Sequence, residues 1–259
     1  MVATSSSVDS LQRGWILKPM TSRSRTPGEA ARSSSTARRG ASLRKFERQA
    51  PDTRRQALMD ATLRCLAERG VEKTSIRNIC EEAGVSVGLV NHYYSSKDAL
   101  IADVYTRLAD GLLASLQAEV QNLAGRPARE RLGAFFRASF SPVVLDPDLL
   151  RAWLSFWSMT HRSELVSAVH ARTYGDYLDT LEGLLRELGD EEAISDLDPR
   201  LAAVGLSGLL DGLWVEWCLN SRTFSPEQGV ALCNAFLVGL TRASQPTGAA
   251  HAVCVQSGS

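Results

Sequence analysis

The feature that most constrains this 259-residue chain is a pair of short helical segments, separated by a three-residue turn, between residues 74 and 100. In the first segment, apolar residues recur at three- and four-residue spacing, which predicts one buried helical face. These residues are Ile76, Ile79, Cys80 and Ala83. Gly84 suits the left-handed conformation that ends a helix, Val85 can pack beneath the turn, and Ser86 can cap the next helix. This punctuation predicts a helix-turn-helix.

A further helix is predicted before this pair, with Asp52 or Thr53 as its cap and Gly70 as its stop. Thr74 or Ser75 then caps the first helix of the pair. Three short helices therefore form one unit.

In the second helix of the pair, Val90 and Tyr94 share a face that can point inward. A long helix follows, with Ser95 or Ser96 as its cap and apolar residues at helical spacing. These residues are Leu100, Ile101, Val104, Leu108, Leu112 and Leu116.

A helix-turn-helix of this kind places its second helix in the major groove of DNA. The residues expected near the bases are Val87, Gly88, Asn91 and His92. Those expected at phosphates are Thr74, Tyr93 and Lys97. Asn91 is suited to pair with adenine. An ordinary helical hairpin is the alternative interpretation of this segment.

Charge is distributed unevenly along the chain although its formal net charge is zero. Residues 1–100 carry 17 Lys and Arg against 10 Asp and Glu, a balance of +7, and residues 101–259 carry 12 against 19, a balance of −7. A basic N-terminal part favours a polyanionic partner, so the charge pattern also predicts DNA binding there.

The composition indicates a cytoplasmic protein, with 44% apolar residues and no apolar run near the roughly 18 residues of a membrane span. We therefore expect no membrane association. The five cysteines are scattered, with no Cys-x-x-Cys pair, so neither a disulfide framework nor a zinc site is predicted. We also expect no cofactor and no catalytic residues, because the chain has no Gly-rich phosphate loop, metal-ligand spacing or nucleophile motif.

The chain divides by composition into four parts. Residues 1–50 are a Ser-, Arg- and Gly-rich mixture, which predicts a disordered basic tail. This tail could be an arm that samples DNA, an inert extension, a false start upstream of a true one such as Met20, or a targeting peptide. The DNA-binding domain is predicted at 51–98, a helical ligand-binding and dimerisation domain at 99–243, and a disordered tail at 244–259.

The larger domain is predicted to be entirely helical, because no strand pattern appears. Helices are expected at 128–140, 147–160, 163–188, 199–220 and 226–242. The last two are long and apolar, which suits a dimer interface of four packed helices. The fold class is therefore all-α.

An aromatic constellation marks this domain. Trp153, Phe156 and Trp157 share one helical face, and Asp211 and Trp214 share a face of a later helix. Core packing explains any one of these residues. As a set, they also describe a cage for a quaternary ammonium, which has no N–H to donate and is recognised by ring faces and a carboxylate.

The helix-turn-helix resembles the DNA-binding signature of TetR-type transcriptional regulators. The matching residues are Thr74, Ile79, Ala83, Gly84, Val85, Ser86, Gly88, Tyr94, Lys97 and Leu100. The chain departs from that pattern at Asn91, where the family often has Tyr. The resemblance implies an all-helical homodimer whose N-terminal domains bind a palindromic operator in double-stranded DNA. It also implies a C-terminal domain that releases the DNA on binding a small ligand.

Residues 151–157 and 209–214 are similar to segments of the BetI branch of this family. That likeness implies a repressor of the genes that convert choline to glycine betaine, with choline or a related quaternary ammonium as inducer. Two alternatives stay open: a TetR-type regulator of efflux or catabolism that senses another small amphipathic ligand, and a helical ligand-binding dimer that does not bind DNA.

Overall fold

The computed structural model describes residues 51–243, which form nine α-helices and no strand. The helices are α2 (Pro51–Lys73), α3 (Ile76–Ala83), α4 (Val87–Tyr93), α5 (Lys97–Gln121), α6 (Ala128–Ser139), α7 (Pro147–Met159), α8 (Glu164–Glu191), α9 (Pro199–Leu219) and α10 (Pro226–Ala243). The all-α prediction is confirmed for this part of the chain, and the expected tails at 1–50 and 244–259 lie outside it.

The turn between α3 and α4 has the predicted geometry. Gly84 adopts a left-handed conformation with φ 67° and ψ 31°, which ends α3. Ser75 caps α3 in a reciprocal pair with Asn78, and Ser86 accepts a hydrogen bond from the Leu89 amide at the start of α4. The short helices therefore begin and end where local hydrogen bonds replace the missing helical ones.

One predicted helix start is wrong and one stop is partly confirmed. The helix α2 already includes Pro51, so Asp52 and Thr53 are inside the helix and cannot cap it as expected. At Gly70 the backbone leaves the helical region, with φ 70° and ψ 176°, and one further helical turn follows to Lys73. The helix is therefore interrupted, not terminated, at Gly70.

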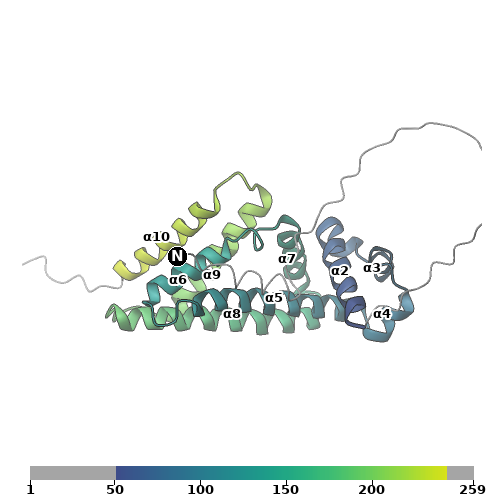
Figure 1. The fold of residues 1–259 in the computed structure, drawn as a ribbon, viewed down its shortest axis with the longest axis horizontal. Helices are drawn as coiled ribbons and strands as arrows, with labels where there is room; N and C mark the ends of the chain where they lie inside the picture. The colour runs from purple at the N-terminus through teal and green to yellow at the C-terminus, as the bar shows by residue number, and fades with distance from the viewer. Residues whose placement is uncertain (1–50, 244–259) are drawn as a thin grey trace, which may run out of the picture.

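Two long helices, α5 and α8, run side by side along the body, and the three N-terminal helices α2, α3 and α4 lie at one end (Figure 1). The helices α6, α9 and α10 lie toward the other end of this pair (Figure 1). Between the two groups stands α7, which packs against α2 as well as against α8 and α9. This arrangement makes α7 a link between the two parts of the molecule.

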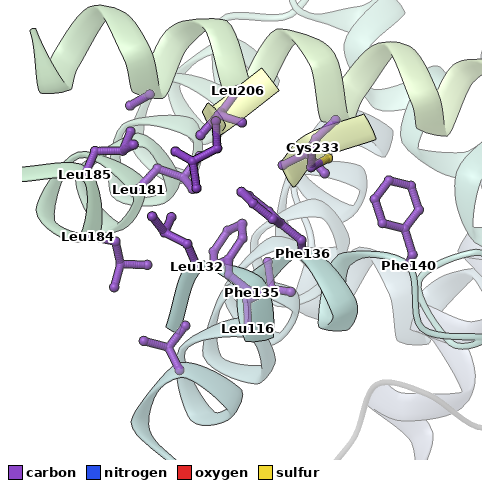
Figure 2. Packing of buried hydrophobic residues seen from close by; sticks show 14 of the residues in the cluster. Leu116, Leu132, Phe135, Phe136, Phe140, Leu181, Leu184, Leu185, Leu206 and Cys233 are labelled. Carbon is purple, nitrogen blue, oxygen red and sulfur yellow. The ribbon is translucent and has the colours of Figure 1, made fainter. Parts of the chain in front are cut away.

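Buried side chains form two clusters. One lies among α5, α6, α8, α9 and α10, with Phe135, Phe136 and Leu181 at its centre (Figure 2). The other joins α2, α3, α4 and the first half of α5 to α7, whose Phe156 is fully buried. The hydrophobic core of the N-terminal unit therefore extends across the expected boundary at residue 98 and includes α7.

Of the helices in residues 51–243, α9 is long and apolar enough to cross a membrane by length and composition, with a mean hydropathy of 1.3. The sequence analysis looked for an uninterrupted apolar run and did not single out α9, because Asp211 and Glu216 interrupt it. In the fold, α9 packs against α7, α8 and α10, and its inner face carries the buried Leu206, Leu210 and Trp214. Its position in the helical core explains its apolar character only in part, because Leu201, Val204 and Leu219 of the same helix are exposed.

Candidate functional site

The second helix of the helix-turn-helix, α4, presents most of its side chains to solvent. Val87 is 44% and Tyr93 39% exposed, and Asn91 and His92 are exposed with them. On the opposite face, Val90 is completely buried. At Gly88 a Cβ atom would meet nothing within 4 Å, so the surface there is open. The arrangement leaves this helix free to enter a groove of DNA.

Thr74 is placed differently from the expectation. Its side chain is 2% exposed, and its hydroxyl donates hydrogen bonds to the carbonyls of Cys65 and Gly70, at 3.1 and 2.7 Å. The hydroxyl stabilises the end of α2 beside the interruption at Gly70. The predicted phosphate contact through this hydroxyl is therefore wrong, because the group is buried and already bonded within the protein.

Lys97 begins α5 as predicted, but its ammonium group also has a structural role. The Nζ atom donates to the carbonyls of Thr74 and Val71, at 3.1 and 3.4 Å, and the side chain is half-buried. These bonds satisfy carbonyls at the end of α2 and join that end to α5. A loss of Lys97 would therefore affect the orientation of the domain as well as any phosphate contact.

A polar network connects the N-terminal unit to the long helix α5. Asp103 accepts hydrogen bonds from the Tyr94 hydroxyl at 2.6 Å and from Arg55 at 2.9 Å, and Arg107 lies 3.3 Å from its other oxygen. Burial alone would raise the pKa of Asp103, but the bonds from Tyr94 and Arg55 outweigh it and hold the pKa below its usual value. The carboxylate therefore stays charged and holds α2, the end of α4 and α5 together.

The charge argument for DNA binding changes once the domain is delimited. Residues 51–98 carry seven Lys and Arg against seven Asp and Glu, so their net charge is zero. The whole excess of seven positive charges belongs to residues 1–50, with ten basic and three acidic residues, outside the described part. The helix-turn-helix must therefore rely on local groups, not on a basic domain, for contact with DNA.

Aromatic residues from four helices surround a small cavity of about 40 Å³, which we call the aromatic box. It is lined by Tyr105, Ala109, Leu112, Leu113, Trp153, Trp157, His170, Thr173, Tyr174, Tyr177, Asp211 and Trp214. The helices α5, α7, α8 and α9 contribute these residues, so the box lies between the two buried clusters. Its volume is that of about one water molecule. The box is narrow in this structure, although it is not sealed from solvent.

Four of the five residues predicted for the cage line the box, and Phe156 does not. Its ring is fully buried and stacks on Tyr105, with ring centroids 4.6 Å apart. Phe156 therefore belongs to the core behind the box. This correction follows from packing, because helical spacing alone does not decide which rings of one face reach a cavity.

The sequence analysis missed Tyr105 and His170, whose side chains meet across the box. The Tyr105 hydroxyl and His170 Nδ1 are 2.8 Å apart, and burial raises the pKa of Tyr105 to about 12 and lowers that of His170. The only sequence signal was an aromatic residue on the inner face of each long helix. Nothing local linked two positions 65 residues apart.

Two polar groups in the box stand out because neither has a hydrogen-bond or ion-pair partner among residues 51–243. Burial raises the pKa of Asp211 to about 7, and no hydrogen bond or ion pair joins its carboxyl group to another of residues 51–243. The Tyr177 hydroxyl is buried and makes no hydrogen bond within the same residues, and its pKa is raised well above the usual value, mainly by burial. Such groups cost free energy unless a ligand satisfies them.

The helix that carries Trp153 and Trp157 also contacts the N-terminal unit. The Ser155 hydroxyl of α7 donates to the Leu66 carbonyl of α2 at 3.3 Å, and Arg162, just after α7, pairs with Glu72. A change in the position of these tryptophans can therefore reach α2 directly.

The outer face of α9 and α10 carries exposed apolar side chains. Leu201 and Leu219 are 69% and 73% exposed, and Val204 and Leu232 are also exposed. Within residues 51–243, no group of three or more His, Cys, Asp or Glu could hold a metal ion.

Comparison with known proteins identifies two families whose domains match this chain. The pattern for bacterial regulatory proteins of the tetR family matches residues 58–104, and that for the BetI-type transcriptional repressor C-terminal domain matches residues 128–242. The HTH-type transcriptional regulator BetI of Serratia proteamaculans is 30% identical over 74% of this chain and 95% of its own length. BetI of Burkholderia thailandensis is 30% identical over 72% and 92%.

Solved structures show the same fold. A putative transcriptional regulator from Pseudomonas aeruginosa PAO1 is 47% identical, covers 77% of this chain and 95% of its own, and has a TM-score of 0.72. A putative transcriptional regulator from Saccharomonospora viridis, solved in complex with choline, has a TM-score of 0.64 at 22% identity, over 72% and 96%. The chain belongs to the TetR family of bacterial regulators and is a DNA-binding transcriptional repressor with a BetI-type C-terminal domain.

Proposed function

We propose that the aromatic box is the inducer site and that the inducer is choline or a closely related quaternary ammonium. The observation that carries the proposal is the convergence of Trp153, Trp157 and Trp214 with the unpartnered Asp211 on one cavity. Each ring facing a desolvated cation contributes about 0.5 to 2 kcal/mol, and the carboxylate supplies the opposite charge. A quaternary ammonium needs no hydrogen-bond acceptor, which suits a site made of ring faces.

Choline also carries a hydroxyl group, and the box contains a buried partner for it. The Tyr177 hydroxyl has no hydrogen bond within the described residues and lies in the lining with Asp211. A bound choline that placed its ammonium among the tryptophans could exchange a hydrogen bond with Tyr177. The two orphaned groups of the box thus correspond to the two polar parts of choline.

We infer the induction mechanism from the small volume of the box. A cavity of about 40 Å³ must open to admit choline, so rings on α5, α7, α8 or α9 must move. Because α7 is bonded to α2 through Ser155, such a movement shifts the helix-turn-helix relative to the long helices. A coupling of about 1 to 3 kcal/mol, or about 5- to 150-fold in operator affinity, is enough for release.

On the DNA side, we propose that Val87, Gly88, Asn91 and His92 meet base edges in the major groove. All four are exposed on one side of α4. Tyr93 stacks edge-on against His92, with ring centroids 5.3 Å apart, and is placed for phosphate contact. Its hydroxyl would then orient the helix without reading sequence.

The operator would be palindromic because the protein acts as a dimer through α9 and α10. The exposed Leu201 and Val204 lie on the same side of α9 as Gly208 and Gly212, where added Cβ atoms would meet nothing within 4 Å. This apolar face lets two copies of α9 approach closely. We further propose that the protein works in the cytoplasm, without enzymatic activity or cofactor, on genes that convert choline to glycine betaine.

The test is a mobility shift at controlled salt, with the full chain and the DNA upstream of its own and neighbouring genes, with and without choline. We expect specific binding that choline weakens. Asn91→Ala should reduce specific affinity about 5- to 150-fold and leave non-specific binding unchanged, whereas Gln121→Ala, at an exposed site at the far end of α5, serves as control. Specific binding that choline does not weaken would contradict the proposal that choline is the inducer. Binding no stronger than to random DNA would contradict the proposal that this DNA contains an operator.

A further inference from the structure

A second and larger cavity lies outside the aromatic box. It is a groove of about 360 Å³ between α2 and α5, which we call the hinge groove. It is lined by Gln56, Met59, Asp60, Leu63, Val104, Arg107, Leu108, Asp110 and Gly111. Its volume falls within the range of about 300 to 1,000 Å³ that is typical of small-molecule sites. The groove is about nine times larger than the box.

The floor of the hinge groove is aliphatic. Met59 and Leu63 of α2 face Val104 and Leu108 of α5, and no aromatic ring is among the lining residues. Such a surface binds alkyl chains through area removed from water, at about 25 cal/mol per Å², and offers no ring face to a quaternary ammonium. Its occupant must therefore be recognised differently from that of the box.

The rim of the groove carries one carboxylate with no ion-pair partner. Arg172 pairs with Asp110 at 2.9 Å, and Arg107 lies 3.3 Å from Asp103. Asp60 accepts a hydrogen bond from the Gln56 amide at 2.7 Å but forms no salt bridge with any of residues 51–243. The charge left for a ligand at this rim is therefore negative.

We infer that the hinge groove is a second ligand site, which binds an amphipathic organic cation with N–H donors. Its ammonium would donate to the Asp60 carboxylate, and its alkyl part would lie on Met59, Leu63 and Leu108. Charge complementarity with Asp60 selects a cation, and the aliphatic floor selects a chain over a compact quaternary group. The inference does not depend on the identity of the inducer in the box.

The position of the groove gives its occupant access to the joint between the two parts of the protein. Arg107 lines the groove and also bonds to Asp103, which holds Arg55 of α2 and Tyr94 at the end of α4. A ligand between α2 and α5 would fix the separation of these helices. The site is therefore placed to act on the joint between α2 and α5, whereas the inducer acts on α2 through α7.

The test compares three eight-carbon probes on the full chain by titration calorimetry: n-octylammonium, n-octanol and octanoate. A hydrogen bond to a charged group is worth about 1.5 to 3 kcal/mol, so octylammonium should bind at least about tenfold more tightly than the other two. Equal affinity for octylammonium and octanoate would overturn the inference, because it would show an apolar surface without charge selection.

Single-residue variants test whether the probes bind in the hinge groove. Asp60→Asn should weaken octylammonium about tenfold without changing octanol binding, whereas Asp190→Asn, at an exposed site near the end of α8, should change neither. Leu63→Phe, which fills the groove, should weaken both probes, and Trp157→Ala should leave octylammonium binding in place. If Asp60→Asn has no effect, or Trp157→Ala abolishes binding, the site is not the hinge groove.

A last arm tests another occupant, the chain's own N-terminal segment. A synthetic peptide with the sequence of residues 11–22, which contains basic and apolar residues, is added to the complex with octylammonium. No displacement supports a small-molecule site. Displacement that Leu63→Phe prevents would assign the groove to that segment and overturn the inference.

Discussion

The aromatic box and the hinge groove differ in almost every physical respect. The box measures about 40 Å³ and is walled by rings from four helices, whereas the groove measures about 360 Å³ and is lined by aliphatic side chains of two helices. Burial raises the pKa of Asp211 in the box to about 7 and Asp211 has no partner among the described residues, whereas Asp60 of the groove accepts a hydrogen bond from the Gln56 amide.

This difference shows that the volume of a cavity without ligand does not identify the effector site. A site smaller than its ligand must widen when the ligand enters, and it is the widening that moves helices and transmits a signal. A larger groove can accept a ligand with little rearrangement, so binding there stabilises an existing geometry. The chemistry of the lining, not its size, distinguishes an inducer site from an accessory one.

The largest effect should come from replacing Trp157 and Phe156, two neighbouring aromatic residues of α7, one at a time. Trp157→Leu removes a ring that lines the box, so the choline concentration for half-release of the operator should rise about 10- to 30-fold. Phe156→Leu removes a ring behind the box and should instead lower stability by about 1 to 3 kcal/mol, with the choline response preserved. Mobility shifts measure the choline response of both variants, and thermal unfolding measures their stability.

The distinction between the box and the core behind it would be wrong if Trp157→Leu and Phe156→Leu had the same effects. In particular, a loss of choline response in Phe156→Leu at unchanged stability would place that ring in the site. Trp217→Phe is a suitable control, because the Trp217 indole donates to the Leu145 carbonyl and does not line the box.

A pH dependence of about tenfold is expected next. Asp211 has a pKa near 7 in the folded protein, so it is mostly neutral at pH 6 and charged at pH 8. Choline affinity should therefore fall about tenfold from pH 8 to pH 6, and Asp211→Asn should remove most of this slope. Calorimetric titration with choline at pH 6, 7 and 8 measures this slope. Repeating it in buffers of different ionisation enthalpy shows whether choline binding releases a proton.

Other titrating groups in the box must be separated from Asp211. Burial lowers the pKa of His170, so its protonation at acidic pH would also oppose a cation, whereas Tyr105, with a pKa of about 12, stays neutral. His170→Gln distinguishes the two causes, because it should keep the slope if Asp211 is responsible. A slope that persists in Asp211→Asn and vanishes in His170→Gln would assign the effect to the imidazole.

The raised pKa of Asp211 also has a consequence for stability. An aspartate that keeps its proton to about pH 7 in the folded state, but loses it near its ordinary pKa when unfolded, costs stability as pH rises through this window. Below both pKa values the cost is absent. Thermal unfolding of Asp211→Asn should therefore be less sensitive to pH between about 4 and 7 than that of the parent.

The smallest effect should come from Tyr177→Phe. Loss of the hydroxyl removes a hydrogen bond worth about 1 kcal/mol to bound choline, so affinity should fall about fivefold. Tetramethylammonium has the same cationic group and no hydroxyl, so its affinity should not fall. An equal loss for both ligands would mean that Tyr177 acts on the shape of the box and not on the choline hydroxyl.

Helix boundaries were largely predictable because they depend on residues a few positions apart. Ser86 and Ser96 cap their helices as expected, and each accepts a hydrogen bond from an amide three residues later. The left-handed Gly84 is equally local. Such interactions are the same in any fold, so periodicity and capping rules identify them.

The candidate site was predictable only in part. Four cage residues were found because they share helix faces with other large side chains, but the same rule included Phe156 and missed Tyr105 and His170. Thr74 was expected at DNA because it matches a family position, yet its hydroxyl is used inside the protein. In each case, the deciding contact joins residues that local patterns do not connect.

The sequence by itself determined the helices, their caps, the short turn of the helix-turn-helix and the family to which the chain belongs. These depend on local hydrogen bonds and on the spacing of apolar residues. Only the tertiary structure decided that α7 packs against α2, that rings from four helices close one box, and that Asp211 lies in it unpaired. Burial and long-range packing set these features, because a side chain's environment depends on which distant helices surround it.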